Sequence, residues 1–482
     1  MTQPVTASRA SAPFTPTWQK FKLTGKQYAQ QYSHIYSKRL LAQGPMCLPR
    51  ASKAFPQATA VPRIIELKES VRSIVVGTLV KESSNRVEVQ GGLSEDAAIV
   101  LDNSDAMKVK AFKTMSDDKD KCVLEDDSGR LALKFLEKED KFGYNYKVRD
   151  LVTGVVVAIV GVVDELGEME VEAIFVGGIE QGDTGDRVKE EIEGMTKATV
   201  GDETSQQPPV VMLASGLQVG KSGGDMLPLQ LLVDYISGSL CGGDAASLLG
   251  SGSGANVARV LIAGGATGST FFTSGDLDEM DVKKAAEPIK VLDEYLSQIC
   301  CNVEVDLMPG ASDPVPLMLP QGSIHPCLLP KSGEWQSLNC TPNPYSARVG
   351  GAKFLGTSGQ PLADMRRFTS SSQAVTMSDT SNDGAPVAIT EMEALESTLN
   401  FRHLTPTGPD SLPTYPFQDQ DPFVIGKNDV PHVLFAGGCE KFETKVVAGV
   451  RLVCVPDFDS TKEVVLVNLE NFECEVVKFE VS

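Results

Sequence analysis

The sequence predicts an α+β protein in which a small closed β-barrel precedes a larger sandwich-like sheet with flanking helices. Between about residues 70 and 180 the apolar residues form several strands with almost no helical periodicity. From residue 210 onward, short apolar strands ending in glycine-rich turns alternate with helical segments. The hydrophobic fraction of 41% over 482 residues is enough for the two cores that this architecture needs.

Charge divides the chain into a basic start and an acidic remainder. The net charge is −20, from 44 Lys and Arg against 64 Asp and Glu, yet residues 1–65 contain nine basic residues and no acid. Residues 1–26, rich in Pro and small polar residues, are predicted to form a disordered basic arm. Such a start also fits a transit peptide or an arm that docks on an acidic partner. The acidic remainder argues against nucleic-acid binding through bulk charge.

A helix is predicted directly after the arm, within the segment 27–65 that leads to the barrel. Tyr28, Tyr32, Ile35, Tyr36 and Leu40 recur at helical spacing and share one apolar face. A stripe of this kind usually packs on the domain that carries it. No apolar run approaches the length of about 20 residues that a membrane-spanning helix needs.

Residues 66–180 are predicted to form an OB-fold barrel. Strands are expected over 73–81, 152–163 and 168–176, and residues 122–135 form a hairpin whose turn contains Asp127, Ser128 and Gly129. Several strands, few helices and about 110 residues are typical of a small closed barrel.

Aromatic residues near the end of this barrel suggest a contact surface. Phe142, Tyr144 and Tyr146 alternate and present one face of a strand. Binding of single-stranded nucleic acid needs stacking aromatics in a basic groove, but residues 71–180 contain 14 basic and 22 acidic residues. These three residues are therefore either a partner or single-strand contact, or a buried aromatic face.

A second domain is predicted over 210–482, after an acidic linker at 181–209. Its strands are expected at 210–213, 257–263, 303–308, 354–355, 432–435, 450–455 and 463–467, and its helices at 280–300 and 390–401. Residues 370–388, rich in Ser and other polar residues, are predicted to be a disordered insertion.

Tight glycine turns recur at residues 214–220, 263–268, 309–313, 356–359 and 436–440. This is the skeleton of a metal-dependent phosphoesterase site, which collects Asp, Asn and His from several turns around two metals. The four histidines of the chain all lie outside these turns. Because Gly, Ala and Ser cannot replace imidazole and carboxylate ligands, we expect no catalytic residue, no metal site and no cofactor.

In their order along the chain, these features resemble the B-subunit family of replicative DNA polymerases, and within it most closely the small subunits of DNA polymerase delta. The resemblance covers about residues 20–480. It rests on the helical segment 27–40, LMPGASDP at 307–314, LPQGSIHPC at 319–327, FLGTSGQ at 354–360, HLTPTGP at 403–409 and YPFQDQDPF at 415–423. It implies an OB-fold joined to an inactivated calcineurin-like phosphoesterase domain.

By the same resemblance, the positions that hold metals in active relatives are vestigial in this chain. They are Gly216 and Gln218 in the first turn, Gly265 and Gly268 in the second, Ala311, Ser312 and Asp313 in the third, and Gly438 and Glu440 in the last. The two acids in this set are too few to hold two metals.

The resemblance implies a non-catalytic accessory subunit of the DNA polymerase delta complex, acting in replication and repair synthesis in the nucleus. Its implied partners are the C-terminal metal-binding domain of the catalytic subunit and a third, smaller subunit. DNA would be contacted only weakly or indirectly, and a membrane not at all. The alternatives are a B-subunit of another replicative polymerase, a residual metallophosphoesterase and a single-strand DNA-binding module. The resemblance also argues against a transit peptide.

Overall fold

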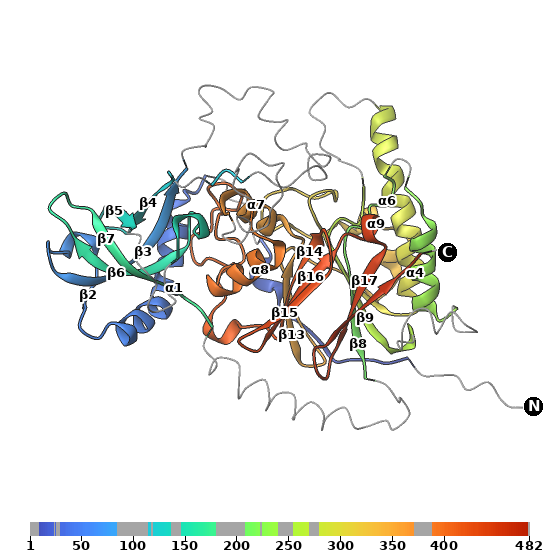
Figure 1. The fold of residues 1–482 in the computed structure, drawn as a ribbon. Helices are drawn as coiled ribbons and strands as arrows, with labels where there is room; N and C mark the ends of the chain where they lie inside the picture. The colour runs from blue at the N-terminus through green and yellow to red at the C-terminus, as the bar shows by residue number, and fades with distance from the viewer. Residues whose placement is uncertain are drawn as a thin grey trace, which may run out of the picture. The chain divides into compact units, whose positions relative to one another are not determined.

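The computed structural model describes residues 9–23, 25, 29–83, 114–116, 119–135, 146–179, 208–221, 224–239, 254–268, 279–370 and 388–480. The chain forms two compact units (Figure 1), and each unit is assembled from separate stretches of sequence. Unit 1 contains residues 1–24, 181–360 and 431–482, and unit 2 contains residues 25–180 and 361–430. The chain therefore passes four times from one unit to the other. The sequence predicted a single domain over 210–482, whereas residues 361–430 group with the barrel.

Unit 1 contains two six-stranded sheets packed against each other. The order in the first sheet is β1 (Phe14–Pro16), β12 (Tyr345–Val349), β13 (Ala352–Thr357), β14 (Val433–Cys439), β16 (Val450–Pro456) and β15 (Glu443–Val447). The order in the second sheet is β11 (Leu338–Cys340), β10 (Glu304–Met308), β9 (Val257–Ala263), β8 (Val210–Ala214), β17 (Glu463–Asn468) and β18 (Cys474–Lys478). All seven strands predicted from the sequence for this part of the chain are present.

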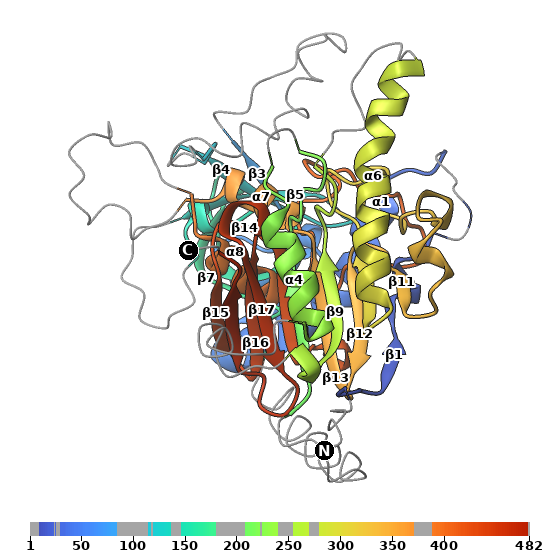
Figure 2. The same ribbon diagram turned by 90° about the vertical axis from the view of Figure 1, so that its right-hand side faces the viewer.

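Two helices cover the second sheet of unit 1 (Figure 2): α4 (Leu227–Ser237) and α6 (Glu279–Cys300). Leu232 of α4 and Leu296 of α6 are buried in the same core as Met212 of β8 and Val260 of β9. Alternate residues of β8 point to opposite faces, so Leu213 faces away from this helical layer. The short helix α9 (Phe458–Thr461) follows β16 and adds Phe458 to the core.

The N-terminal strap, defined here as residues 9–21, packs on unit 1. Its strand β1 pairs antiparallel with β12, and the 3-10 helix η1 (Trp18–Phe21) follows. Trp18 is 6% exposed and Phe21 is 1% exposed, and the guanidinium of Arg259 lies 3.6 Å from the ring centroid of Phe14. The prediction of disorder over 1–26 is therefore wrong for the strap, because its aromatic side chains gain more by burial than its prolines and polar residues suggest.

The barrel of unit 2 is a closed ring of five strands. Strand β3 (Arg72–Glu82) pairs with β4 (Lys121–Glu125), β4 with β5 (Arg130–Phe135), β5 with β7 (Met169–Val176), β7 with β6 (Val156–Val163), and β6 again with β3. Strand β2 (Thr59–Val61) pairs with β3 outside the ring. The hairpin predicted at 122–135 is present with its turn in the expected place.

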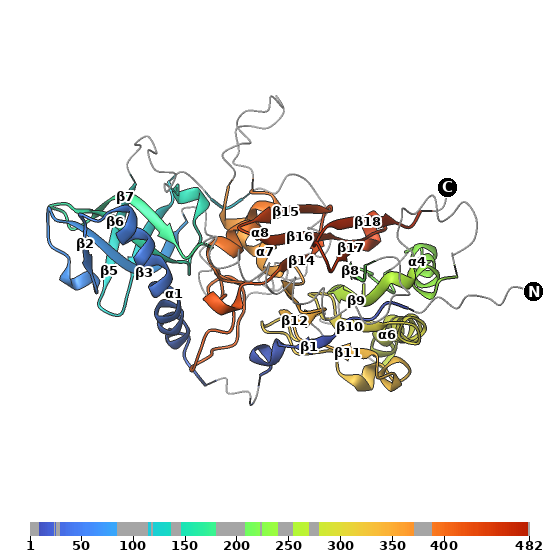
Figure 3. The same cartoon turned by 90° about the horizontal axis from the view of Figure 1, so that it is seen from below.

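One long helix, α1 (Ser33–Ala54), packs on this barrel (Figure 3). Cys47, Ala51 and Phe55 share a core with Ile74 of β3 and Phe175 of β7. The helix begins later and ends later than the predicted segment. It continues through Pro45 and Pro49, since both lie on its exposed side while its other face stays in contact with the barrel.

Unit 2 also contains the helices α7 (Gln360–Phe368) and α8 (Glu391–Asn400). The first residue of α7, Gln360, still belongs to unit 1. Helix α8 starts with a capping box between Thr390 and Glu393. Short 3-10 helices occur in both units: η2 (Ile64–Glu66), η4 (Val148–Asp150), η5 (Gly254–Asn256), η6 (Pro326–Leu328), η7 (Ser332–Glu334) and η9 (Lys427–Asp429). None of the helices in the described part of the chain has the length and apolar character to cross a bilayer.

A buried ionic network connects the separate stretches of unit 2. The guanidinium of Arg39 on α1 is fully buried and its Nε donates to Asp421 Oδ2 at 2.8 Å. It also donates to the carbonyls of Gly154 and Pro406, each at 3.0 Å, and of Gly408 at 2.8 Å. The ring of His403 meets the same Asp421 oxygen at 2.9 Å. One side chain thus holds α1, the barrel and the 401–424 segment together.

Four predicted features fall wholly or largely outside the described residues. They are residues 1–8 of the arm, most of the linker 181–209, the insertion 370–388 except its ends, and the pair Phe142 and Tyr144.

Candidate functional site

The glycine turns that follow β8, β9, β10 and β13 meet within unit 1, together with Gly437 and Gly438, which lie inside β14 where its pairing with β16 is irregular. The amide of Gly216 donates to the carbonyl of Gly264 at 2.9 Å, and the amide of Gln218 donates to that of Gly265 at 3.0 Å. The amide of Gly438 donates to Ser215 Oγ at 2.8 Å. The structure therefore brings the first, second and last of the predicted turns into direct hydrogen-bonded contact.

Asp313 lies at the centre of this cluster, and both of its carboxylate oxygens accept hydrogen bonds from the protein. Oδ2 accepts from the amides of Gly310 at 2.7 Å and Gly265 at 2.9 Å. Oδ1 accepts from the amide of Thr267 at 2.9 Å and from its hydroxyl at 3.1 Å. Burial raises the pKa of the Asp313 carboxyl, and these hydrogen bonds oppose that rise. Asp313 therefore ties two turns together, with both oxygens already bonded.

Four further predicted positions are exposed, half-buried or hydrogen-bonded to a neighbouring turn. Ala311 and Glu440 are exposed and Ser312 is half-buried, while the amide of Gly268 donates to the carbonyl of Val219 at 2.9 Å. Cys439, between Gly438 and Glu440, is buried.

The turns approach one another so closely that side chains do not fit at several glycines. A Cβ on Gly216 would lie 2.1 Å from Asp457 Oδ2, and Gly216 has φ of +64°. A Cβ on Gly437 would lie 2.1 Å from the carbonyl oxygen of Ala263. Real Cβ atoms do not approach other heavy atoms to such distances. The first and last turns are thus packed against neighbouring groups where a ligand side chain would have to enter.

Uncharged side chains form a network beside these turns. Asn343 Nδ2 lies 2.8 Å from Gln321 Oε1, 2.8 Å from Ser358 Oγ and 2.9 Å from Gln360 Oε1. Gln321 Nε2 donates to the carbonyl of Gly310 at 3.2 Å, and Gln360 Nε2 donates to Gln321 Oε1 at 2.9 Å. Gln321 and Asn343 are fully buried. Amides satisfy one another without a cation, so this network stabilises the turns in a neutral form.

Sequence reasoning did not assign a role to Gln321, Asn343 or Gln360. Gln321 and Gln360 lie in the motifs at 319–327 and 354–360, and Asn343 lies between these motifs, but Gln and Asn do not mark a metal or acid–base site. The available signal was their position next to strand-ending glycine turns, where buried polar side chains must find partners.

The donors present do not fit a two-metal centre. Within the described ranges, no group of three or more His, Cys, Asp or Glu side chains is arranged to hold a metal ion. Two of the four histidines have other partners: His432 Nδ1 accepts from the amide of Lys353 at 2.9 Å, and His403 belongs to the network of Arg39.

Tyr146 is the one residue of the predicted aromatic contact that the structure describes. Its ring lies 6.4 Å from that of Phe401 within unit 2, and burial raises the pKa of its hydroxyl. Much of this side chain is therefore used in packing, which favours the interpretation of a buried aromatic face.

Three of the four arginines in the acid-free N-terminal segment 1–65 are bound to carbonyls within their own units. Arg9 donates to the carbonyl of Val257 at 3.4 Å and to that of Ile236, and Arg50 donates to that of Val176 at 2.7 Å. Together with buried Arg39, they satisfy backbone carbonyls. These three arginines therefore stabilise the fold, which argues against a role in binding an external acidic partner.

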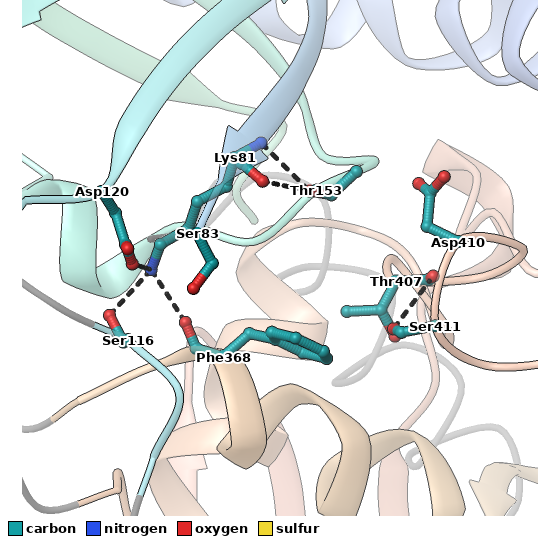
Figure 4. A pocket seen from close by; sticks show the side chains of 9 residues that line it. All are labelled: Lys81, Ser83, Ser116, Asp120, Thr153, Phe368, Thr407, Asp410 and Ser411. Atoms are coloured by element: carbon teal, nitrogen blue, oxygen red, sulfur yellow. Dashed lines mark hydrogen bonds and ion pairs between the residues drawn. The ribbon is translucent and has the colours of Figure 1, made fainter. Parts of the chain in front are cut away.

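A small pocket in unit 2 is lined mainly by residues with polar side chains (Figure 4). It is lined by Lys81, Ser83, Ser116, Asp120, Thr153, Phe368, Thr407, Asp410 and Ser411. The Lys81 ammonium donates to Ser116 Oγ at 2.9 Å and to the carbonyl of Phe368 at 2.8 Å, and pairs with Asp120 at 3.5 Å. Burial lowers the pKa of Lys81, and Asp120 opposes this. An ammonium has three protons, so all of its donors are used within unit 2.

Two family models match the chain, one in each part of the predicted architecture. Residues 31–174 match the OB-fold domain of the DNA polymerase delta subunit, and residues 211–444 match the B-subunit of DNA polymerases alpha and epsilon. A solved structure of an archaeal phosphodiesterase is similar over 56% of this chain and 98% of its own, with 11% identity and a TM-score of 0.25.

Full-length relatives carry the assignment. The DNA polymerase delta small subunit of Oryza sativa subsp. japonica is 31% identical, covering 98% of this chain and 99% of the relative. That of Arabidopsis thaliana is 32% identical, covering 96% of this chain and 94% of the relative. With such identity across almost the whole length, the chain belongs to the DNA polymerase delta small-subunit family.

Proposed function

We propose that this chain is a non-catalytic scaffold of the DNA polymerase delta complex, working in the nucleus in replication and repair synthesis. It binds the C-terminal metal-binding domain of the catalytic subunit and bridges it to a third, smaller subunit. Membership of the small-subunit family supports this role, and the bridging partners and the compartment are the proposed part.

The state of the glycine turns is the single observation that carries the non-catalytic role. Metal-assisted hydrolysis needs several carboxylate and imidazole ligands around an open site. Here Asp313 is saturated by amides and the Gly216 turn packs against Asp457. Buried, uncharged Gln321 and Asn343 complete the cluster. With its polar groups bonded to one another, this cluster leaves the surrounding surface free to serve as a contact surface.

The electrostatics favour an indirect relation to DNA. Phosphate binding needs surplus Lys and Arg on one face, whereas the chain carries a net charge of −20 and several of its arginines bind its own carbonyls. In a complex with a catalytic subunit, the DNA contacts would then belong to the other chains.

Co-expression of the full chain with the C-terminal tail of the catalytic subunit tests the scaffold. We expect the two proteins to co-purify through affinity and size-exclusion steps at equal stoichiometry. Purification of the two as separate, folded proteins would rule out the scaffold function.

A parallel assay addresses residual hydrolysis. The chain is incubated with Mn²⁺ and a phosphodiester substrate, beside the variant Asp313→Ala. We expect neither protein to turn over the substrate. Turnover by the wild type that Asp313→Ala abolishes would instead establish a metallophosphoesterase.

A further inference from the structure

One end of the barrel in unit 2 exposes several large apolar side chains. Leu166 is 84% exposed, Ile65 is 70% exposed and Val71 is 38% exposed. Single exposed apolar residues are ordinary, but a group of them on one surface marks a site of association.

The chain topology brings these residues to the same end of the barrel. The amide of Ile65 donates to Ser128 Oγ at 3.2 Å, which places η2 against the β4–β5 turn. Strands β5 and β7 run parallel with Leu133 opposite Met169, so the β6–β7 turn that carries Leu166 also lies at this end. The chain continues from η2 to Ser70, just before Val71. The amide of Ser70 donates to the carbonyl of Val163 at 3.0 Å, so Val71 also lies close to this end of the barrel.

The surroundings of these apolar residues are acidic. Residues 63–72, 125–130, 134 and 164–172 contain ten carboxylates and five basic side chains. Four of the basic residues are paired: Arg63 with Glu66, Arg72 with Glu172, Arg130 with Glu125, and Lys134 with Glu170. Among the described residues, Glu69, Asp127 and Glu165 form no salt bridge, and all three are exposed.

We propose that the barrel-end patch (Ile65, Val71 and Leu166 with Glu69, Asp127 and Glu165) docks a basic amphipathic segment of another subunit of the polymerase complex. The apolar side chains anchor the partner by burial, and the carboxylates select Lys and Arg around the anchors. This inference rests on the proposed scaffold function, since it needs a further protein chain in the complex.

Charge complementarity favours a basic protein segment over two other possible ligands of the patch, namely DNA and a second copy of this chain. Phosphates of DNA would meet Asp127 and Glu165 with charge of the same sign. A second copy of this chain would bring the same acidic patch against itself, because a two-fold interface repeats one surface. A basic segment of a different protein is the occupant whose charge is complementary.

Photocrosslinking in the assembled complex tests the proposal. The full chain carries p-benzoylphenylalanine in place of Leu166 and is co-expressed with the catalytic and third subunits. The matched control carries it in place of Val446, which is 53% exposed on edge strand β15 of unit 1. We expect position 166 to crosslink to a peptide of another subunit with a clear excess of Lys and Arg, and position 446 not to label that peptide.

A double variant supplies the affinity measurement. Ile65→Glu with Leu166→Glu changes exposed side chains only, so circular dichroism should match the wild type. We expect affinity for the crosslinked subunit to fall by about tenfold or more, as for loss of interface anchors. Wild-type affinity should also fall as NaCl rises from about 50 to 300 mM, because exposed charges are screened.

Several outcomes would overturn the proposal. They are no crosslink from position 166, a crosslink to a neutral or acidic peptide, to a second copy or to DNA, or unchanged affinity of the double variant. Failure of the scaffold function gives a different result, since the wild-type chain would then not co-purify with the catalytic tail at all.

Discussion

Unit 2 of the Arg39→Met variant should unfold far more readily than unit 2 of the wild type. The buried guanidinium donates to Asp421 and to three backbone carbonyls at 2.8–3.0 Å, and Met keeps much of its apolar volume while removing every donor. Removing one partner of a buried ion pair costs about 3–5 kcal/mol. For Arg39→Met this corresponds to a fall in the unfolding midpoint of roughly 6–20 °C for a unit of this size.

The assay must report on unit 2 itself. Both tryptophans, Trp18 and Trp335, belong to unit 1, so tryptophan fluorescence follows the wrong part of the chain. Amide hydrogen exchange of β3 and β6, measured by mass spectrometry against urea, follows the barrel directly. Arg63→Met is the matched control, because Arg63 pairs with Glu66 on the surface at side-chain exposures of 56% and 40%. Exposed pairs contribute little, so this variant should unfold like the wild type.

Equal behaviour of the two variants would refute this account of Arg39. Equal urea midpoints for Arg39→Met and Arg63→Met would mean that the Asp421 network does not hold α1 and the 401–424 segment on the barrel. A loss of protection confined to α1, with β3 and β6 unchanged, would also contradict it, because the network joins all three parts of the unit and its loss should weaken the unit as a whole.

Three further predictions concern buried groups elsewhere in the two units. Burial and the neighbouring Arg39 lower the pKa of His403 to about 4, so on acidification the unfolded state protonates this imidazole before the folded state does. Up to about 3 kcal/mol of stability should therefore be lost as pH falls from about 6.5 to 4. The urea midpoint of the wild type should fall over this pH range, and that of His403→Gln should lack much of the fall. Trp18→Ala should lower the thermal midpoint of unit 1 by removing about 3–5 kcal/mol of stability, while the same change at Trp335, which is 42% exposed, should have a much smaller effect in calorimetry. Gly216→Asp places a carboxylate in the first turn, where the new Cβ would collide with Asp457. This variant should therefore destabilise unit 1 and bind no Mn²⁺ in isothermal titration. Mn²⁺ binding by a stable Gly216→Asp protein would show that the turn can open.

The secondary structure of unit 1 could be predicted because its signals are local. Strands such as β8 are continuous apolar runs, and α6 was expected within one residue of its observed start. The extension of α1 was missed because Pro45 and Pro49 usually end a helix. Here the buried face of Met46, Cys47 and Ala51 keeps the helix intact.

The strap and the buried networks were missed because they depend on partners far away in the sequence. Phe14 and Trp18 lie among prolines, and nothing local indicates that Arg259 and Tyr345 will receive them. Arg39 in turn was only one of the nine basic residues of segment 1–65, because nothing near it in the sequence indicates that Asp421 will bind it. Glycine turns, in contrast, are recognisable locally, so most of them could be located without coordinates.

The distance along the sequence between the strap and its partner strand has a consequence for synthesis. Thr17 bonds to Ser346, 329 residues later in the chain. At translation rates of about 5–20 residues per second, β12 leaves the ribosome roughly 16–66 s after β1. During that interval Trp18 and Phe21 have no strand to cover them. A chain that terminates early would keep these aromatics exposed, which gives chaperones and proteases a way to recognise an unfinished copy before it can enter the polymerase.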